Sequence, residues 1–323
     1  MERRGSYPTF FATAWARELK IAGKSEKEIE DIVSQGREDT LANRATINGK
    51  AVNVYGNPEA VKDPNFTPAS GKIGFGFDLD KKGAGTPDSF EEAETHEKGV
   101  DNQAARALGC FHAFRANYPE RSSNWELWWG LASDSTPAWL ITIVAEDFTK
   151  DGDATLTFER SLDHTTRDAN SRTRADATFR IDPNPTSRSV FRGRIKDGTF
   201  TSIEPTTVSM IGDALVLPHL QMHQARIRLK LKPDGSIDGV LGGYQPWRDI
   251  YFGMGGGNGF GYESNIGANV PAAYYLLKRL ADAEPDPKTG QNTAISATWR
   301  IEGVRAKVAP AVLPSRSDAA ANR

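Results

Sequence analysis

The sequence predicts a mainly β protein, an antiparallel β-sandwich or jelly-roll-like domain with peripheral helices and a helical N-terminal extension. Apolar and basic residues alternate without interruption over 225–232, which is typical of a strand with one buried face. The same alternation of apolar and polar residues recurs over 295–302. Asp-Gly turn sequences at 151–152 and 197–198 separate further short apolar runs. Many short strands at this spacing favour a sandwich or jelly roll.

The first seventy residues predict the helical extension. Ser25 and Glu28 have the spacing of a capping box, so a helix is expected from there to about Asn43. Asn48-Gly49 is the preferred dipeptide of a type I′ turn, which predicts a hairpin over 46–54. The expected division is therefore an extension with a hairpin over 1–70, a β-sandwich domain over 71–304 and a flexible tail over 305–323.

Within the β domain, the turn signals and alternation delimit eight strands and two helices. The expected strands cover 138–146, 154–160, 174–181, 188–195, 198–203, 225–232, 237–244 and 295–302. One helix is expected to begin with Asp101 as its N-cap and to run to about Asn117. The other has Asn269 as its expected cap and Pro271 in its first turn.

Composition excludes several classes of function. The formal net charge is −2, which provides no overall field to attract nucleic acid or an anionic membrane. The longest apolar run, residues 137–145, has the length of a strand and is too short to span a bilayer. Cys110 is the one cysteine, so an internal disulfide and a cysteine-based zinc cluster are excluded. No apolar segment follows Met1, so no signal peptide is predicted at this terminus.

Two acid-rich segments form the leading candidate site. The first ends in Asp78-Leu79-Asp80, and the second is Asp101-Asn102-Gln103. Together they offer five side chains with oxygen atoms, and oxygen is the ligand that Ca²⁺ prefers. The hypothesis is therefore a Ca²⁺ site formed by Asp78, Asp80, Asp101, Asn102 and Gln103. The alternative is that Asp101 caps a helix while Asp78 and Asp80 occupy a polar turn.

A second metal hypothesis concerns His219, Met222 and His223. The two histidines have i, i+4 spacing, and histidine with methionine suits copper. No Glu follows His219 in the manner of the zinc protease motif H-E-x-x-H, so that activity is excluded. A structural histidine pair is the alternative, and copper is the weaker of the two metal hypotheses.

Two further segments have the composition of ligand sites. Glu126 lies among Trp125, Trp128 and Trp129, and a carboxylate beside aromatic rings that can stack on sugars is typical of a glycan-binding cleft. The alternative is that these tryptophans anchor the core or an interface. The glycine-rich segment 253–261 does not match G-x-G-x-x-G and is not followed by G-K-[ST]. The segment 253–261 is therefore interpreted as a flexible loop that closes over a ligand or a partner.

Four stretches together resemble an uncharacterised group of bacterial exported proteins. These are Gly76-Phe77-Asp78-Leu79-Asp80, Gly99-Val100-Asp101-Asn102-Gln103, Val240-Leu241-Gly242-Gly243-Tyr244 and residues 295–302. The resemblance extends over residues 71–304 and implies a bacterial origin and export, but no activity. Glycine often follows Asp-Leu-Asp in such proteins, whereas this chain has Lys81 there.

The sequence favours a non-catalytic periplasmic or secreted binding or accessory protein, stabilised by a structural Ca²⁺. A protein partner or a homo-oligomer is expected, with no nucleic acid and no membrane span. The alternative is an enzyme or redox protein, with a glycan cleft near Trp125–Trp129 or a transition metal at His219 and His223. A cytoplasmic location stays open, because few cysteines suit both compartments.

Overall fold

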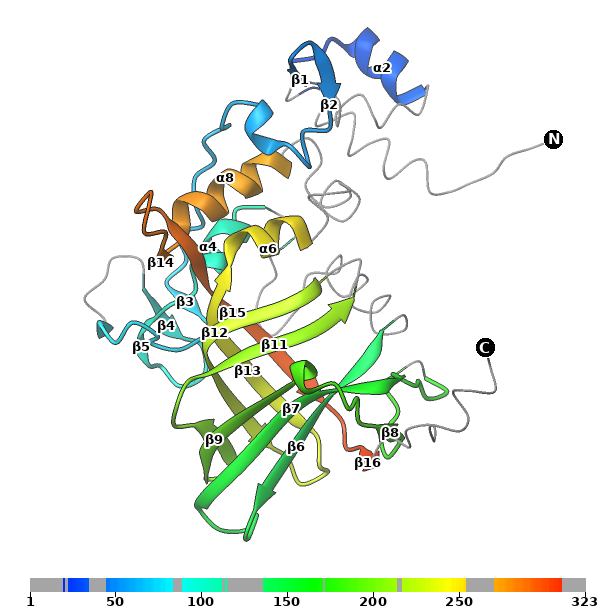
Figure 1. Ribbon diagram of the computed structural model, residues 1–323, viewed down its shortest axis with the longest axis vertical. Coiled ribbons are helices and arrows are strands. Elements are labelled where there is room, and N and C mark those ends of the chain that lie inside the picture. The colour runs from blue at the N-terminus through cyan, green and yellow to red at the C-terminus, as the bar shows by residue number, and fades with distance from the viewer. Residues whose placement is uncertain are drawn as a thin grey trace, which may run out of the picture. The chain divides into compact units, whose positions relative to one another are not determined.

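The protein is described by a computed structural model (Figure 1). The described residues are 20, 23–34, 45–83, 89–111, 114, 136–170, 172–213, 217–253 and 270–309. The chain divides into two compact units. Unit 1 comprises residues 1–129, 214–218 and 244–297, and unit 2 comprises residues 130–213, 219–243 and 298–323.

The described residues form a mainly β protein with a few peripheral helices, as predicted. A nine-stranded sheet has the order β14-β15-β13-β12-β10-β9-β7-β6, with β11 paired to β12 beside this path. Its strands are β6 (Pro137–Ala145), β7 (Gly152–His164), β9 (Arg188–Lys196), β10 (Thr199–Ser202), β11 (Thr206–Asp213), β12 (Leu217–Leu231), β13 (Ile237–Pro246), β14 (Ala283–Pro285) and β15 (Asn292–Gly303). Seven of the eight expected strands are found in it, and its other two strands, β11 and β14, were not anticipated.

The core of unit 2 lies on one face of its strands. Buried and exposed residues alternate strictly along β9, as a half-buried antiparallel strand requires. Strand β11 pairs with β12 and also packs on β9 and β7, so strands from different parts of the sheet enclose the core between them. The largest fully buried side chains there are Phe158, Phe191, Phe200, Leu156, Ile195, Met210 and Leu220.

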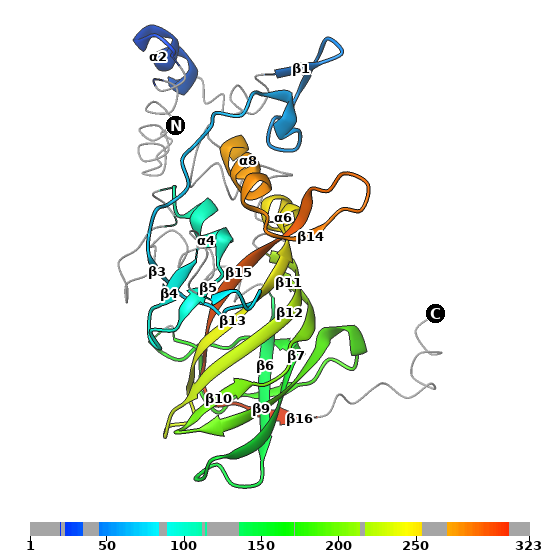
Figure 2. The ribbon, with the colours of Figure 1, turned by 90° about the vertical axis from the view of Figure 1, so that its left-hand side faces the viewer.

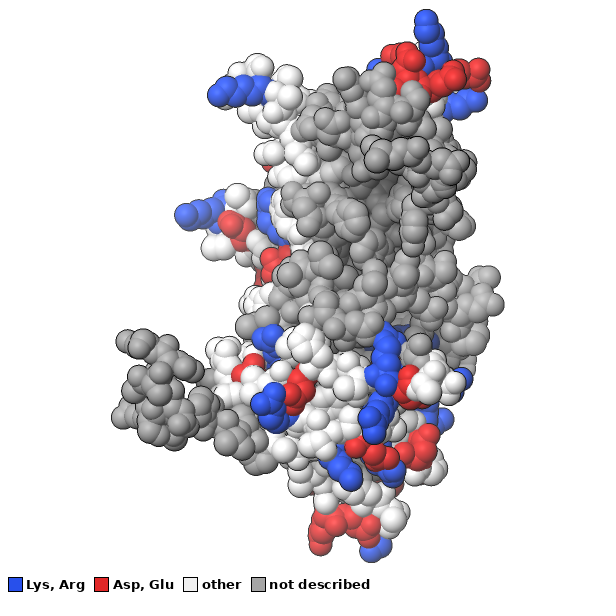
Figure 3. Space-filling view, turned by 90° about the vertical axis from the view of Figure 1, so that its right-hand side faces the viewer, with Lys and Arg blue, Asp and Glu red and all other residues white. Residues whose placement is uncertain are grey.

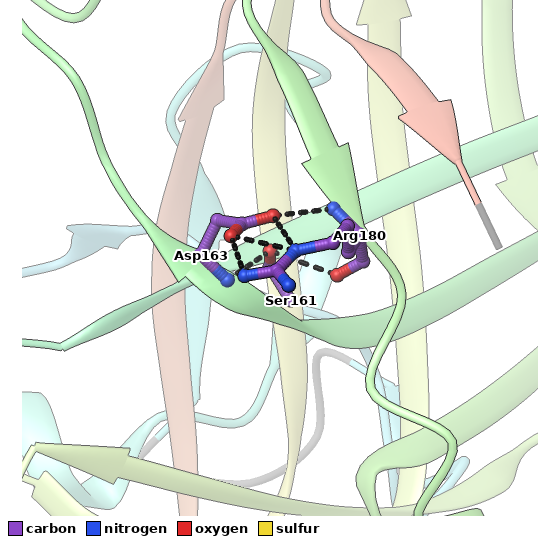
Figure 4. A network of polar contacts seen from close by, with 3 residues as sticks. All are labelled: Ser161, Asp163 and Arg180. Carbon is purple, nitrogen blue, oxygen red and sulfur yellow. Dashed lines mark hydrogen bonds and ion pairs between the residues drawn. The ribbon is translucent and has the colours of Figure 1, made fainter. Parts of the chain in front are cut away.

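A short parallel pair of strands extends unit 2 beyond the large sheet. Strand β8 (Thr178–Arg180) pairs with β16 (Lys307–Ala309), which lies within the segment assigned to a tail from the sequence. Arg180 binds Asp163 through its backbone N–H (2.6 Å) and its guanidinium (Nε–Oδ1, 3.0 Å) (Figure 4). Ser161 Oγ donates a hydrogen bond to the carbonyl of Arg180 (3.1 Å). These contacts attach β8 to the end of β7.

Unit 1 contains four described helices and a buried aromatic cluster at α6, α8 and Tyr55. The helices are α2 (Glu26–Ser34), α4 (Gln103–Leu108), α6 (Trp247–Tyr251) and α8 (Val270–Leu280); one-turn 3₁₀ helices are η1 (Pro58–Ala60) and, in unit 2, η4 (Pro185–Ser187). Tyr55, Tyr251 and Tyr274 are fully buried, and Tyr251 Oη donates to the carbonyl of Tyr55 (2.9 Å). Tyr274 Oη donates to Glu59 (2.7 Å). Both hydroxyls are therefore satisfied in the core.

Two local predictions for the N-terminal segment are confirmed. Ser25 and Glu28 form the capping box of α2, with Ser25 N–H donating to Glu28 (2.9 Å) and Glu28 N–H to Ser25 Oγ (3.3 Å). Strands β1 (Ala45–Ile47) and β2 (Lys50–Val52) form the hairpin. Asn48 and Gly49 both have positive φ, as a type I′ turn requires.

A small sheet in unit 1 positions the acidic segments. It consists of β3 (Ile73–Gly74), β4 (Phe90–Glu92) and β5 (Lys98–Val100), in that order. Figures 1 and 2 both show it beside α4, which follows β5 almost directly in the chain. Helix α4 packs in turn against α8. The predicted acidic site therefore lies where β5 passes into α4.

Candidate metal centre

A single backbone bridge brings the two acidic segments together. Phe77 and Asp101 form an isolated antiparallel bridge, in which Asp101 N–H donates to the carbonyl of Phe77 (2.9 Å). Asn102 Nδ2 donates to the carbonyl of Phe75 (2.9 Å) beside it. Leu79 and Asp80 follow this bridge, and their backbone N–H groups both donate to the Asp101 carboxylate. The predicted proximity of the two segments is confirmed.

Three carboxylates converge at this point. One oxygen each of Asp78, Asp80 and Asp101 lies within 4.8 Å of the other two. Calcium binds oxygen ligands at about 2.3–2.6 Å, so ligands of one ion lie up to about 5 Å apart. Asp101 is buried, with 7% of its surface exposed, whereas the Asp80 side chain keeps 25% exposed. The group therefore has an inner end closed by protein and an outer end open to water, and it could hold a metal ion.

Hydrogen bonds fix the inner carboxylates. Asp101 Oδ2 accepts hydrogen bonds from the backbone N–H groups of Leu79 (2.8 Å) and Asp80 (3.2 Å). Asp78 Oδ2 accepts one from Gly83 N–H (3.2 Å). Asp78 Oδ1 is buried but has no hydrogen-bond partner among the described residues. A buried oxygen left in this condition is costly unless a cation or water binds it.

The third carboxylate already has a cation. Asp80 Oδ2 lies 2.8 Å from Lys82 Nζ, and Asp80 Oδ1 accepts a hydrogen bond from Lys82 N–H (2.9 Å). Burial acts to raise the pKa of Asp80, but the hydrogen bonds and charge of Lys82 outweigh it and leave the pKa lowered. Lys82 is largely exposed, so its ammonium covers the open end of the group.

The electrostatics of Asp101 are those of a carboxylate crowded by others. Burial raises its pKa from 3.8 to about 6, the two backbone hydrogen bonds oppose the shift, and Asp80 and Asp282 add to it. The pKa of buried Tyr244 is raised as well, first by burial and then by four nearby carboxylates, those of Asp101, Asp282, Asp80 and Asp78. Negative charge therefore accumulates around one buried point, which favours a bound cation.

Asp282 is the residue of this neighbourhood that sequence reasoning missed. Its carboxylate accepts hydrogen bonds from the backbone N–H and the hydroxyl of Ser296, both at 2.7 Å. Ser296 is fully buried, and its Oγ accepts the N–H of Gln103 (2.9 Å). Burial of its carboxylate raises the pKa of Asp282, although the hydrogen bonds from Ser296 act to lower it. Asp282 lies far along the chain from Asp101, so no local spacing could have indicated it.

Asn102 and Gln103 lie at the start of α4, and their role as metal ligands stays a prediction. Asn102, rather than Asp101, is the N-cap of α4: its Oδ1 accepts the N–H of Ala105 (3.2 Å). Asn102 therefore uses its side-chain oxygen on the helix. Gln103 is buried at the first position of α4, and its backbone N–H donates to Ser296 Oγ (2.9 Å). The expected cap at Asp101 is corrected accordingly, because the Phe77 bridge holds that residue in extended backbone.

The histidine set is not brought together as a set of ligands. All three residues lie on β12, where four residues span about 13 Å of strand, so the Cα atoms of His219 and His223 are far apart. His219 is exposed and bonds Ser209 Oγ (3.0 Å), and His223 bonds Gln221 (3.0 Å). Met222 points to the opposite face and is fully buried.

The other candidates are partly outside the described residues. The residues Trp125, Glu126, Trp128 and Trp129 lie outside the described part of the chain, and so does most of the segment 253–261.

Cys110 follows α4 and donates a weak hydrogen bond to the carbonyl of Ala107 (3.3 Å). No helix among the described residues is long and apolar enough to cross a membrane.

Comparison with known proteins assigns no family. No family model and no curated protein matches the chain. One solved structure, the dimer form of the M. tuberculosis PknI sensor domain, is 11% identical with a TM-score of 0.23, over 56% of this chain and 79% of that one. A likeness of this size indicates neither a shared fold nor a function, so the function is inferred from the site itself.

Proposed function

We propose that this protein is a non-catalytic binding or accessory protein in which Asp78, Asp80 and Asp101 hold a structural Ca²⁺. The observation that carries the proposal is the convergence of three carboxylates, one of which, that of Asp78, has a buried oxygen without a hydrogen-bond partner among the described residues. The donors are all oxygen atoms, which suit a hard cation, whereas zinc and copper prefer nitrogen or sulfur. Calcium also tolerates the irregular geometry of a site made from two loops better than magnesium does.

The ion would act on stability. It would bind the loop after Phe77 and the start of α4 at the same time, while Ser296 links that start to the strand β15. An ion that binds only the folded state stabilises it by about 2.7 kcal/mol at one hundred times its dissociation constant. No step of catalysis is required of these residues.

The wider setting of the proposal comes from the sequence. The resemblance to bacterial exported proteins supports a periplasmic or secreted location, where free Ca²⁺ is available to a site of modest affinity. A protein partner or a second copy of the chain stays part of the proposal. The alternative enzyme or redox function gains no support from the histidines of β12, and its tryptophan cleft lies outside the described residues.

The variant Asp78→Asn tests the site, because it removes the charge of the carboxylate and keeps the size of the side chain. We expect the wild-type melting temperature to rise on addition of Ca²⁺, and we expect this rise to be lost in Asp78→Asn. The reason is that an amide oxygen is a weaker, uncharged ligand. The matched control is Asp153→Asn, which changes an 83% exposed aspartate in unit 2. An equal Ca²⁺ response in Asp78→Asn and wild type would remove the site from consideration.

A further inference from the structure

We propose that the outer edge of strand β6 pairs with the same edge of a second copy of this chain, so that the two sheets continue into each other. Strand β6 ends the nine-stranded sheet (Figure 1): it pairs with β7 on one side and with no described strand on the other. The inference rests on the proposed function only in its choice of a second copy as the partner. It uses residues of unit 2 alone and does not depend on calcium in unit 1.

The composition of β6 leaves this edge unprotected. None of its nine residues is charged, and all except Thr142 are apolar. Edge strands usually avoid pairing with another chain through short length, charges, proline or a bulge. The strand at the other end of the sheet has such protection, because β14 is three residues long and contains Glu284 and Pro285. In β6, Pro137 and the bulge beside it lie at the start, whereas residues 139–145 pair regularly with β7.

The core of unit 2 is incompletely covered at this edge. Ile141 and Ile143 lie opposite Phe158 and Leu156 of β7, and directly opposite residues of an antiparallel pair share one face of the sheet. The ring of Trp139 packs edge-on against Phe158 on this face, with the ring centroids 5.5 Å apart. Phe158 and Leu156 are 2% and 0% exposed, whereas Ile141 and Ile143 stay partly exposed. A further strand beside β6 would bury both isoleucines, as β6 itself buries its neighbours on β7.

The regular part of β6 is complementary to itself on the core side. The midpoint of residues 139–145 is Thr142, and a two-fold axis there makes the two strands antiparallel. Ile141 of each copy then lies opposite Ile143 of the other, and pairs of β-branched side chains stabilise antiparallel strands. Trp139 lies opposite Ala145, so the largest side chain of the strand faces one of the smallest.

The same axis brings no charges into conflict on the other face. Leu140 lies opposite Val144, which is 65% exposed in the single chain, and the two copies of Thr142 meet on the axis. Glu146, the first charged residue after β6, lies opposite Ala138. Charged side chains of both signs are interspersed among the described residues on the face shown in Figure 3, so an uncharged edge of this length is a local feature.

Sedimentation velocity of the full chain, at about 1 to about 300 μM, tests the proposal. We expect a reversible, concentration-dependent dimer, because a single strand edge buries less than about 1,200 Å² and interfaces of this size are weak. Thr142→Lys places two like charges opposite each other on the axis and should weaken dimerisation about tenfold or more, and so should Thr142→Glu. An equal mixture of the two variants should recover the dimer, because the opposed charges then attract. This recovery also shows that both variants are folded.

The matched control is Thr155→Glu, which adds the same charge to an exposed position on the same face of the sheet, one strand further from the edge. It should change the dimerisation constant by less than about twofold. Asp78→Asn should dimerise like the wild type, so a failure of the calcium site and a failure of this proposal are distinguishable.

Three results would overturn the pairing of β6 with its own copy. The first is a wild-type chain that stays monomeric at the highest concentration, which would leave the edge to an extended segment of another protein. The second is a dimer that persists unchanged in Thr142→Lys and Thr142→Glu, because another surface would then form it. The third is a mixture of the two variants that stays monomeric, because the two copies of Thr142 would then not meet.

Discussion

Lys82 is the residue that decides how readily the site accepts a metal ion. Its ammonium lies 2.8 Å from Asp80, where an entering cation would have to replace it. The hydrogen bond to Asp80 raises the pKa of Lys82, and the charges of Asp80, Asp101 and Asp282 add to this shift. Lys82 therefore acts as an internal counter-ion for the group.

Replacement of Lys82 by alanine is expected to strengthen Ca²⁺ binding. Because Lys82 then no longer competes for Asp80, the dissociation constant should fall about two- to fivefold. Isothermal titration calorimetry measures this directly. Lys62→Ala is the control, since it removes the same charge from an exposed position in another part of unit 1. Weaker binding in Lys82→Ala would show that Lys82 supports the site instead of competing for it.

The raised pKa of Asp101 gives the protein a pH dependence with a definite sign. Without metal, the folded state holds a proton on Asp101 up to about pH 6, whereas the unfolded state releases it near 3.8. This group's contribution to stability therefore falls as pH rises from about 4 to about 6, and is constant above that range. Calcium requires the ionised form, so its stabilising effect should grow over the same interval.

Melting curves between pH 4.5 and 7.5, in EDTA and in Ca²⁺, measure this dependence. We expect the gain in melting temperature from Ca²⁺ to be small below about pH 5 and to level off above about pH 7. Asp78→Asn should show no such growth, because its site lacks one of the charged ligands. A gain that is independent of pH would contradict the assignment of Asp101 as a ligand.

At the scale of elements, the N-terminus of α4 fixes the position of the acidic site. Asn102 caps the helix through Oδ1 and donates through Nδ2 to the carbonyl of Phe75. Asn102→Ala loses both bonds in a buried position and should lower the free energy of unfolding by about 1–2 kcal/mol. Urea denaturation measures this. Asn57→Ala is the control, since Asn57 precedes η1 without a side-chain cap, and should cost less than about 0.5 kcal/mol.

Local patterns predicted most of these elements. Strict alternation located β12 and β15, and the Asn48-Gly49 turn and the Ser25–Glu28 box need only residues close in sequence. Strand β11 was missed because its segment, 206–213, contains Thr206, Thr207 and Gly212 and has no clean alternation. The N-cap was assigned one residue early, since Asp101 and Asn102 are equally good caps and only the distant Phe77 decides between them.

At the scale of the molecule, sequence proximity was enough to propose three ligands but not their surroundings. Asp78, Asp80 and Asp101 are close in sequence, and one backbone bridge suffices to join them. Asp282, Ser296 and Tyr244 reach the same point from the last third of unit 1, which local spacing cannot reveal.

The most direct measurement is the metal content of the purified protein by plasma mass spectrometry, together with melting curves in EDTA and in Ca²⁺. The account predicts about one equivalent of calcium per chain and a lower melting temperature after EDTA treatment. Protein that carries no calcium, and whose melting temperature is unaffected by EDTA or by added Ca²⁺, would contradict it. In that case Asp78, Asp80 and Asp101 would serve only the turn and the backbone bridge.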